Sequence, residues 1–401
     1  MLKSIATVTY HHLRRNNKQV FGKASRWSCG LHSSTISFEN QNTYTSQKHG
    51  SECSSVHQHQ PIDPAEEEAP VQKLQRIQQQ QAANPSINNI ASQVLYETVD
   101  ISQITEQEFK GYIEALRKTL RAVNPEQYSI ALLQKGEDSV NMLTVLYCLN
   151  AEWATIKDHT KTASTGQLRL SWWKDQLKNT LVGQPPRVPA LLALAYLQQK
   201  KPENKLTFSQ FRNIFKWRES DLRWKQPAAL KDIENYSDGV YGSLLMAHLQ
   251  FLGLRNVHTD HVSTHLGRSY GLCTLLRAVP HLVEHSSTYL PAQLCARYGV
   301  SEDDIYNKQN TKAIEDVVFR VADLAKSHLD LARELADMKE NGKLVVDPKS
   351  YPVFYSAMVC EVFLERLQKA DFNIFDESLS AQSMRFAILY RMGKTSWFGK
   401  Y

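Results

Sequence analysis

The sequence predicts an all-α protein from about residue 93 onward. Alternating runs that could form strands are nearly absent, and the flanks of Asp238-Gly239 do not alternate between apolar and polar residues. Apolar residues recur instead at the helical period, in one amphipathic stretch after another. We therefore expect a helical core and no extended sheet.

Two stretches show the helical pattern most clearly. Residues 107–120 place Phe109, Tyr112, Ile113 and Leu116 on one face. Residues 313–338 sustain such a face for about seven turns, with His328 as its one polar residue. Short breaks at 183–186 and 201–204 separate some of the eight to ten helices we expect. No Gly-, Ser- or Pro-rich stretch divides residues 93–395, which predicts one domain.

The start of the chain has a different composition. Residues 1–38 contain six Lys or Arg, no Asp or Glu, and frequent Ser and Thr. This pattern predicts a mitochondrial presequence, and a disordered basic tail is the alternative. Residues 39–92 include a Gln run, several Ser and Asn and few aromatics, so they cannot bury enough apolar surface to fold. We expect a disordered linker there.

Composition also excludes several classes of protein. No apolar run approaches the ~18–20 residues of a membrane-spanning helix. The six cysteines contain no Cys-x-x-Cys pair, and four fall in apolar helical patterns, which predicts reduced thiols without a disulfide framework or zinc ribbon. The basic and aromatic run at 212–225 belongs to no recognisable nucleic-acid module. We interpret it as a solvated face or a face for acidic lipids.

Three segments carry the functional signal, namely residues 146–158, 166–175 and 265–281. In order and spacing they resemble the squalene/phytoene synthase family. That resemblance implies an isoprenoid-synthase-like helical domain with a central cavity. In the family, two facing helices each carry a carboxylate-rich motif, and these carboxylates hold magnesium ions against the substrate diphosphate.

The matched motifs have lost most of their carboxylates. The first falls on residues 154–158 and the second on 274–282. The positions expected to line the matched pocket are Ala154, Thr155, Asp158, Arg277, Ala278 and His281. Glu152 lies about 240° around a continuous helix from Asp158, and Glu284 lies beyond the helix end expected at Pro280. One carboxylate cannot hold three magnesium ions, so we expect no synthase catalysis and no cofactor.

The residues around the lost carboxylates form a pattern of their own. It resembles a branch of the family whose members act early in the assembly of mitochondrial respiratory complex I. The signature positions are Gly166, Arg169, Trp173, His261, His265, Gly267, Gly271 and Pro280. Residues 367–375 fit the same branch.

The branch implies a non-catalytic assembly factor, attached peripherally to the matrix side of the mitochondrial inner membrane. Its expected partners are complex I subunits or other assembly factors, and not nucleic acid. The alternative is an active prenyl-diphosphate-using synthase, of the phytoene or squalene type, with an altered metal site. That alternative gains weight if Glu152 or Asp175 joins Asp158 on one wall. A lipid-binding protein outside respiration is a third class.

Two features within these segments have competing interpretations. Arg277 lies in an apolar stretch, so its charge must be paired or face a polar pocket. A buried pair with Asp158 or another acid is favoured over contact with a diphosphate or lipid head group. Trp172 and Trp173 fit core packing slightly better than a membrane interface.

The histidines also allow two interpretations. His258, His261 and His265 are spaced to face one way along a helix, and His281 could approach them. Histidine is a common zinc ligand, but a fourth ligand is not evident in the sequence, and there is no His-Glu-x-x-His motif. Hydrogen-bonded structural histidines are therefore the preferred interpretation, with no metal site.

Overall fold

Helix α4 (Glu106–Val123) shows how this sequence builds its core. The computed structural model describes residues 98–398. Thr105 and Glu108 form a reciprocal capping box at the start of α4, which satisfies donors that the first turn leaves unpaired. The helix then buries Phe109, Ile113, Leu116 and Leu120. The helix predicted at 107–120 is confirmed.

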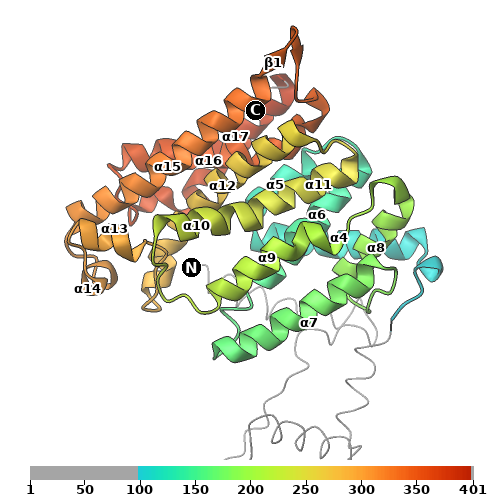
Figure 1. Cartoon of the computed structure of the whole chain (residues 1–401), viewed down its shortest axis with the longest axis horizontal. Helices are drawn as coiled ribbons and strands as arrows, with labels where there is room; N and C mark the ends of the chain where they lie inside the picture. The colour runs from blue at the N-terminus through green and yellow to red at the C-terminus, as the bar shows by residue number, and fades with distance from the viewer. Residues whose placement is uncertain (1–97, 399–401) are drawn as a thin grey trace, which may run out of the picture. The chain divides into compact units, whose positions relative to one another are not determined.

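The described residues form an all-α fold (Figure 1). After η1 (Ile101–Gln103) and α4 come α5 (Pro125–Leu132), α6 (Glu137–Ala154), α7 (Ala163–Leu181), α8 (Pro189–Lys200), η2 (Pro202–Asn204), α9 (Phe208–Asp221), α10 (Leu230–Ser237), the π-helix η3 (Asp238–Gly242) and α11 (Ser243–Leu252). The chain continues with α12 (Val257–Val283), α13 (Ala292–Arg297), α14 (Glu302–Tyr306), α15 (Thr311–Asp337), β1 (Lys339–Glu340), β2 (Lys343–Leu344), η4 (Pro348–Phe354), α16 (Ser356–Lys369), η5 (Glu377–Leu379) and α17 (Ala381–Phe398). More helices occur here than the eight to ten expected, because short helices such as α13 and α14 leave little periodic pattern.

Helix α12 is the centre of the fold. It packs along α15, which runs beside it in Figure 1, and it also contacts α10, η3, α11 and α16. Helices α7, α8 and α9 lie on the opposite side of the molecule from α15 and α16 (Figure 1). The predicted long helix at 313–338 is confirmed as α15, with His328 on its buried face.

A short hairpin was missed in the sequence. Strands β1 and β2 pair antiparallel around Asn341-Gly342, with both turn residues at positive φ of 51° and 75°. Asn-Gly is the dipeptide that such two-residue turns prefer. The flanks are too short and too exposed to show alternation, so the period-2 criterion does not detect them.

Several further predictions can be compared with the structure. Cys148, Cys273, Cys295 and Cys360 are buried and unbridged, as expected for the four cysteines in helical patterns. Within residues 98–398, no helix has the length and apolarity required to cross a bilayer. The presequence at 1–38 and the linker at 39–92 lie outside the described residues, and the domain limits 93 and 395 stay predictions.

Candidate functional site

The first matched motif lies where helix α6 ends. The helix stops at Ala154, and the Thr155 hydroxyl donates back to the carbonyls of Ala151 and Glu152 at 3.0 and 3.2 Å. Asp158 therefore stands in the following turn, with an exposed side chain. A metal motif stacks its carboxylates along one helix face, and this segment has no such face. The angle of about 240° expected on a continuous helix does not apply, because the helix does not continue.

Two carboxyl groups lie close together in the sequence here, that of Glu152 in the last turn of α6 and that of Asp158 in the turn that follows. Glu152 is an exposed residue, and desolvation raises the pKa of its carboxyl group. Desolvation also raises the pKa of Asp158, while His159 and His281 favour its charged form. His159 favours the charged form of Glu152 as well. Asp175 pairs with a neighbour on the surface of α7 instead.

Arg277 of the second motif is neutralised by Glu126, which lies in the first turn of α5. Its Nη1 and Nη2 donate to the two carboxylate oxygens at 2.8 and 2.7 Å. Both side chains are largely buried, with 20% and 9% exposure. The expected buried pair is therefore present, and its acid is Glu126 rather than Asp158. In this bidentate contact both terminal nitrogens of the guanidinium donate to Glu126, which leaves fewer N–H donors for an anionic ligand.

Helix α12 continues through Pro280 to Val283, and the helix end expected at Pro280 is wrong. Proline removes one donor, but the buried side chains of Val279 and Val283 hold the last turn against the core. Ala278 and His281 lie half-buried on this part of the helix, and neither supplies a carboxylate.

A buried polar network beside the last turns of α6 was missed in the sequence. Arg218 of α9 donates to the Asn150 amide oxygen at 2.8 Å and to the Tyr236 hydroxyl at 2.5 Å. Burial opposes the charge of Arg218, but nearby tyrosines and Asp221 outweigh this and raise its pKa. Arg218 fixes α6, α9 and α10 to one another.

Asp221, three residues later, organises the other half of this network. Its Oδ1 accepts from the Tyr289 hydroxyl at 2.7 Å and from the Lys157 ammonium at 3.1 Å. Lys157 also donates to the carbonyl of Trp224 at 2.9 Å. The run at 212–225 is thus not wholly the solvated or lipid-binding face that we expected. The signal for burial was the position of Arg218 and Asp221 beside the apolar residues of α9.

These contacts limit the chemistry of the site. The three cations nearest the matched motifs, Arg277, Arg218 and Lys157, are held by protein groups. The carboxylates Glu152 and Asp158 come from one segment only, and the facing part of α12 offers none between Thr274 and Leu282. The usual arrangement, in which carboxylates on two facing helices bridge magnesium to a diphosphate, is not available from these positions.

Residues 126–385 match the squalene/phytoene synthase family. The chain belongs to this family. Its fold agrees: the squalene synthase of Alicyclobacillus acidocaldarius superposes with a TM-score of 0.57 at 15% identity, covering 69% of this chain and 99% of that one. A dehydrosqualene synthase superposes with a TM-score of 0.58 at 17% identity, over 72% and 97% of the two chains. The predicted fold class is confirmed, while the central cavity stays a prediction.

Curated relatives place the chain within one branch of the family. The human protein named NADH dehydrogenase (ubiquinone) complex I, assembly factor 6 is 31% identical over 264 residues, or 66% of this chain and 76% of that protein. The Dictyostelium discoideum homologue is 28% identical over 316 residues, or 78% and 84%. A 15-cis-phytoene synthase of Synechococcus elongatus is 20% identical over 279 residues, or 66% and 86%. The predicted resemblance to the assembly-factor branch is confirmed.

The glycines among the signature residues allow neighbouring helices to pack closely. A Cβ on Gly267 would lie 2.3 Å from the backbone nitrogen of Gly242, in the π-helix η3. A Cβ on Gly271 would lie 2.3 Å from the Cβ of Ser237 at the end of α10. Gly166, at the start of α7, meets Leu222 in the same way, with 2.8 Å to a side-chain carbon. These glycines set helix spacing and carry no side chain that could take part in chemistry.

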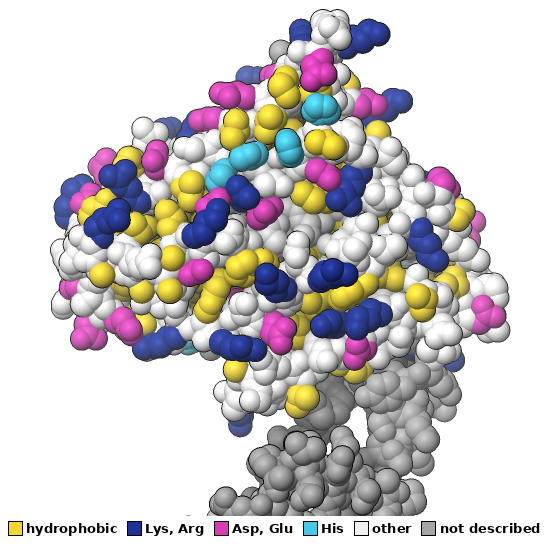
Figure 2. Space-filling model, viewed as in Figure 1, with side chains coloured by type: hydrophobic (Ala, Val, Ile, Leu, Met, Phe, Trp, Pro, Cys, Tyr) yellow, Lys and Arg dark blue, Asp and Glu magenta, His cyan; other side chains and the backbone are white. Residues whose placement is uncertain are grey.

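The signature histidines do not converge with His281. The Nδ1 atoms of His265 and of His328 on α15 are 3.0 Å apart, and burial lowers the pKa of His328 to about 4. Desolvation lowers the pKa of His265 as well, and one of the two Nδ1 atoms donates to the other. Glu234 lies 3.5 Å from His328, whereas His261 is exposed. Figure 2 shows several histidine side chains in a row on the surface. The hydrogen bond between His265 and His328 agrees with the preferred interpretation of His265 as a structural residue.

Two signature residues on α7 complete the set. Trp173 packs partly buried against the core and meets Trp172 edge to face, with ring centroids 5.1 Å apart. This contact agrees with the slight preference for core packing. Arg169 is partly exposed on the same helix.

A separate hollow of about 140 Å³ lies between α4 and α6, away from the matched motifs. Its lining includes Phe109, Ile113, Arg117 and Asn141. The Arg117 guanidinium donates to the Asn141 amide oxygen at 2.8 Å, which closes one side of the hollow.

Proposed function

We propose that this protein is an assembly factor for mitochondrial respiratory complex I that acts by binding rather than by catalysis. The observation that carries the proposal is the state of the second motif. Arg277 is neutralised by Glu126, and its neighbours Ala278 and His281 stand where the family has carboxylates. Relatives named complex I assembly factor 6 support an assembly role.

The proposed location is the matrix side of the inner membrane. The acid-free, basic composition of residues 1–38 supports import into mitochondria. Peripheral attachment is supported by α17, which turns Phe386, Leu389 and Tyr390 outward with 79%, 40% and 75% exposure. These three residues lie at i, i+3 and i+4, so they form one stripe along the helix.

Basic residues flank this apolar stripe. Arg385 and Lys394 are exposed. Around the helix axis, Arg385 lies about 100° to one side of Phe386 and Lys394 about 80° to the other side. An interfacial helix on an anionic membrane requires basic residues at such positions. Vesicle flotation tests the contact, with phosphatidylcholine vesicles that contain or lack cardiolipin. We expect flotation with cardiolipin and its loss in F386S/Y390S, while L168S on α7, another exposed apolar residue, keeps it. Equal flotation of F386S/Y390S would exclude α17 as the contact.

The assembly role is tested by complementation. Cells that lack their own assembly factor 6 receive the wild-type chain or the E152Q/D158N variant, and assembled complex I is measured on native gels. A binding function predicts equal rescue, because neither carboxylate acts chemically. Failure of E152Q/D158N at normal protein level would contradict the non-catalytic proposal.

One observation favours a second candidate, a prenyl-diphosphate synthase with an altered metal site. Glu152 lies in the last turn of α6 and Asp158 in the turn that follows, and His159 favours the charged form of both, so the second acid that this alternative requires stands in the same segment. The purified protein is therefore incubated with farnesyl or geranylgeranyl diphosphate, with and without magnesium. A magnesium-dependent coupled prenyl product, absent in E152Q/D158N, would establish the synthase.

A further inference from the structure

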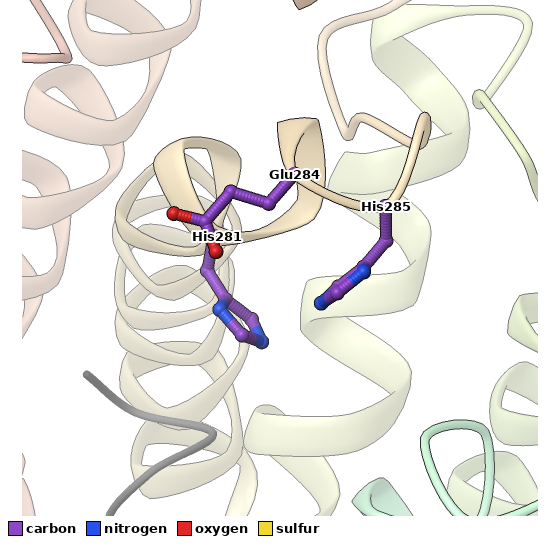
Figure 3. Close-up of side chains that lie close together, drawn as sticks. All are labelled: His281, Glu284 and His285. Carbon is purple, nitrogen blue, oxygen red and sulfur yellow. The ribbon is translucent and has the colours of Figure 1, made fainter.

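Three potential metal ligands meet at the end of helix α12. His281 lies in its last turn, Glu284 caps it, and His285 follows. One ligand atom from each of these side chains lies within 4.8 Å of the others. Figure 3 shows both imidazoles projecting from the same side of the helix end, and the Glu284 side chain turns back so that its carboxylate lies near His281. The spacing i, i+3, i+4 explains this convergence, because it returns to one helix face after a turn.

The backbone that carries these ligands is fixed. The N–H of His285 donates to the carbonyl of Leu282 at 2.8 Å, and buried Val283 anchors the last turn. Ser286 then turns the chain away with a φ of 49°. The carboxyl end of a helix carries partial negative charge, which favours a cation at this position.

The ligand types point to zinc rather than magnesium. Two imidazoles and one carboxylate match the His₂Glu set that binds Zn²⁺ and leaves a fourth position open, whereas magnesium prefers oxygen ligands alone. A tetrahedral zinc site needs ligand atoms about 3.4 Å apart. Glu284 and His285 are exposed, so small side-chain rotations can close the present separation.

We propose that His281, Glu284 and His285 form a Zn²⁺ site at the carboxyl end of α12, with its fourth position open to water or to a ligand from a partner. This proposal concerns metal binding by the isolated protein and does not depend on the assembly role.

The same helix supplies a matched control. His258 and His261 lie at i and i+3 near the start of α12, partly or fully exposed, and belong to no ligand group among the described residues. The sequence also contains His57 and His59, two residues apart, which could bind zinc adventitiously. Both pairs must be varied separately.

The test uses the purified full-length chain with Zn²⁺ in calorimetry and with Co²⁺ in visible absorption. We expect one metal per chain and the absorption of tetrahedral Co²⁺. H281A/H285A should weaken Zn²⁺ binding by more than roughly tenfold, since losing even an outer-shell partner of a ligand costs 10–100-fold. E284Q, at an exposed position, should weaken it with the fold unchanged by circular dichroism.

H258A/H261A and H57A/H59A should bind as the wild type does. No metal binding by the wild-type chain would overturn the proposal. The proposal would also be overturned if Zn²⁺ binding survived in both H281A/H285A and E284Q but disappeared in either control pair.

Discussion

Replacing Gly267 by alanine tests whether the signature glycines set the distance between helices. The new Cβ would lie 2.3 Å from the nitrogen and 2.5 Å from the Cα of Gly242, where ordinary contacts begin at 3.4 Å. The obstacle is backbone and cannot rotate away, so α12 and η3 must separate by roughly 1 Å in a close-packed core. Overpacking of this kind costs about 3 kcal/mol, the upper end of the usual range.

Alanine also has a better helix propensity than glycine, worth about 1 kcal/mol. We therefore expect G267A to lower the free energy of unfolding by about 2 kcal/mol. Gly111, within α4, is the matched control, because its Cβ would meet nothing within 4 Å. G111A should raise the free energy of unfolding by about 0.5–1 kcal/mol, so the two substitutions have opposite signs.

Urea unfolding followed by circular dichroism at 222 nm measures both variants. The midpoint should fall for G267A and rise for G111A, with unchanged slopes. If G267A were as stable as the wild type, the close approach of α12 to η3 would not constrain this position. A fall in both variants would show that helix propensity does not govern Gly111.

Three further predictions concern charges. E126Q leaves Arg277 buried without its counter-ion and should lower the free energy of unfolding by about 3 kcal/mol. The double variant E126L/R277M should recover most of this lost stability. Equal stability of E126Q and the wild type would refute the pairing. Buried His248 bonds Ser139, and burial lowers its pKa to about 3 from 6.5, so its neutral form stabilises the fold fully above pH 6.5. Stability should fall by up to about 1.4 kcal/mol per pH unit as pH drops from 6.5 toward 3, and H248Q should show a shallower fall in urea titrations. Desolvation raises the pKa of Glu152, so the charged carboxylate destabilises the fold at pH 7 and E152Q should raise the urea midpoint. This gain should vanish below pH 4.5, the ordinary pKa of a glutamate, where the carboxyl group is protonated. A gain that persists below that pH would point to a cause other than charge.

The sequence by itself determined the helices and the family. Amphipathic patterns at 107–120 and 313–338 predicted α4 and α15, because a helix's periodicity depends only on neighbours a turn away. The order of three short segments indicated the squalene/phytoene synthase family, and the residues at 154–158 and 274–282 showed that the carboxylates were missing. The spacing of the cysteines and the apolar helical patterns around four of them predicted buried, reduced thiols.

Only the tertiary structure decided which charges meet. Arg277 was expected to have an acidic partner, but Glu126 lies 151 residues earlier, and nothing in the local pattern of α5 singles it out. Arg218 and Asp221 were interpreted as part of a solvated run. Their position beside the apolar residues of α9 could have indicated burial, but sequence spacing cannot show that their partners are Tyr236 and Tyr289. The continuation of α12 through Pro280 likewise depended on buried valines packing against distant helices, and it is that last turn which brings His281 and His285 together.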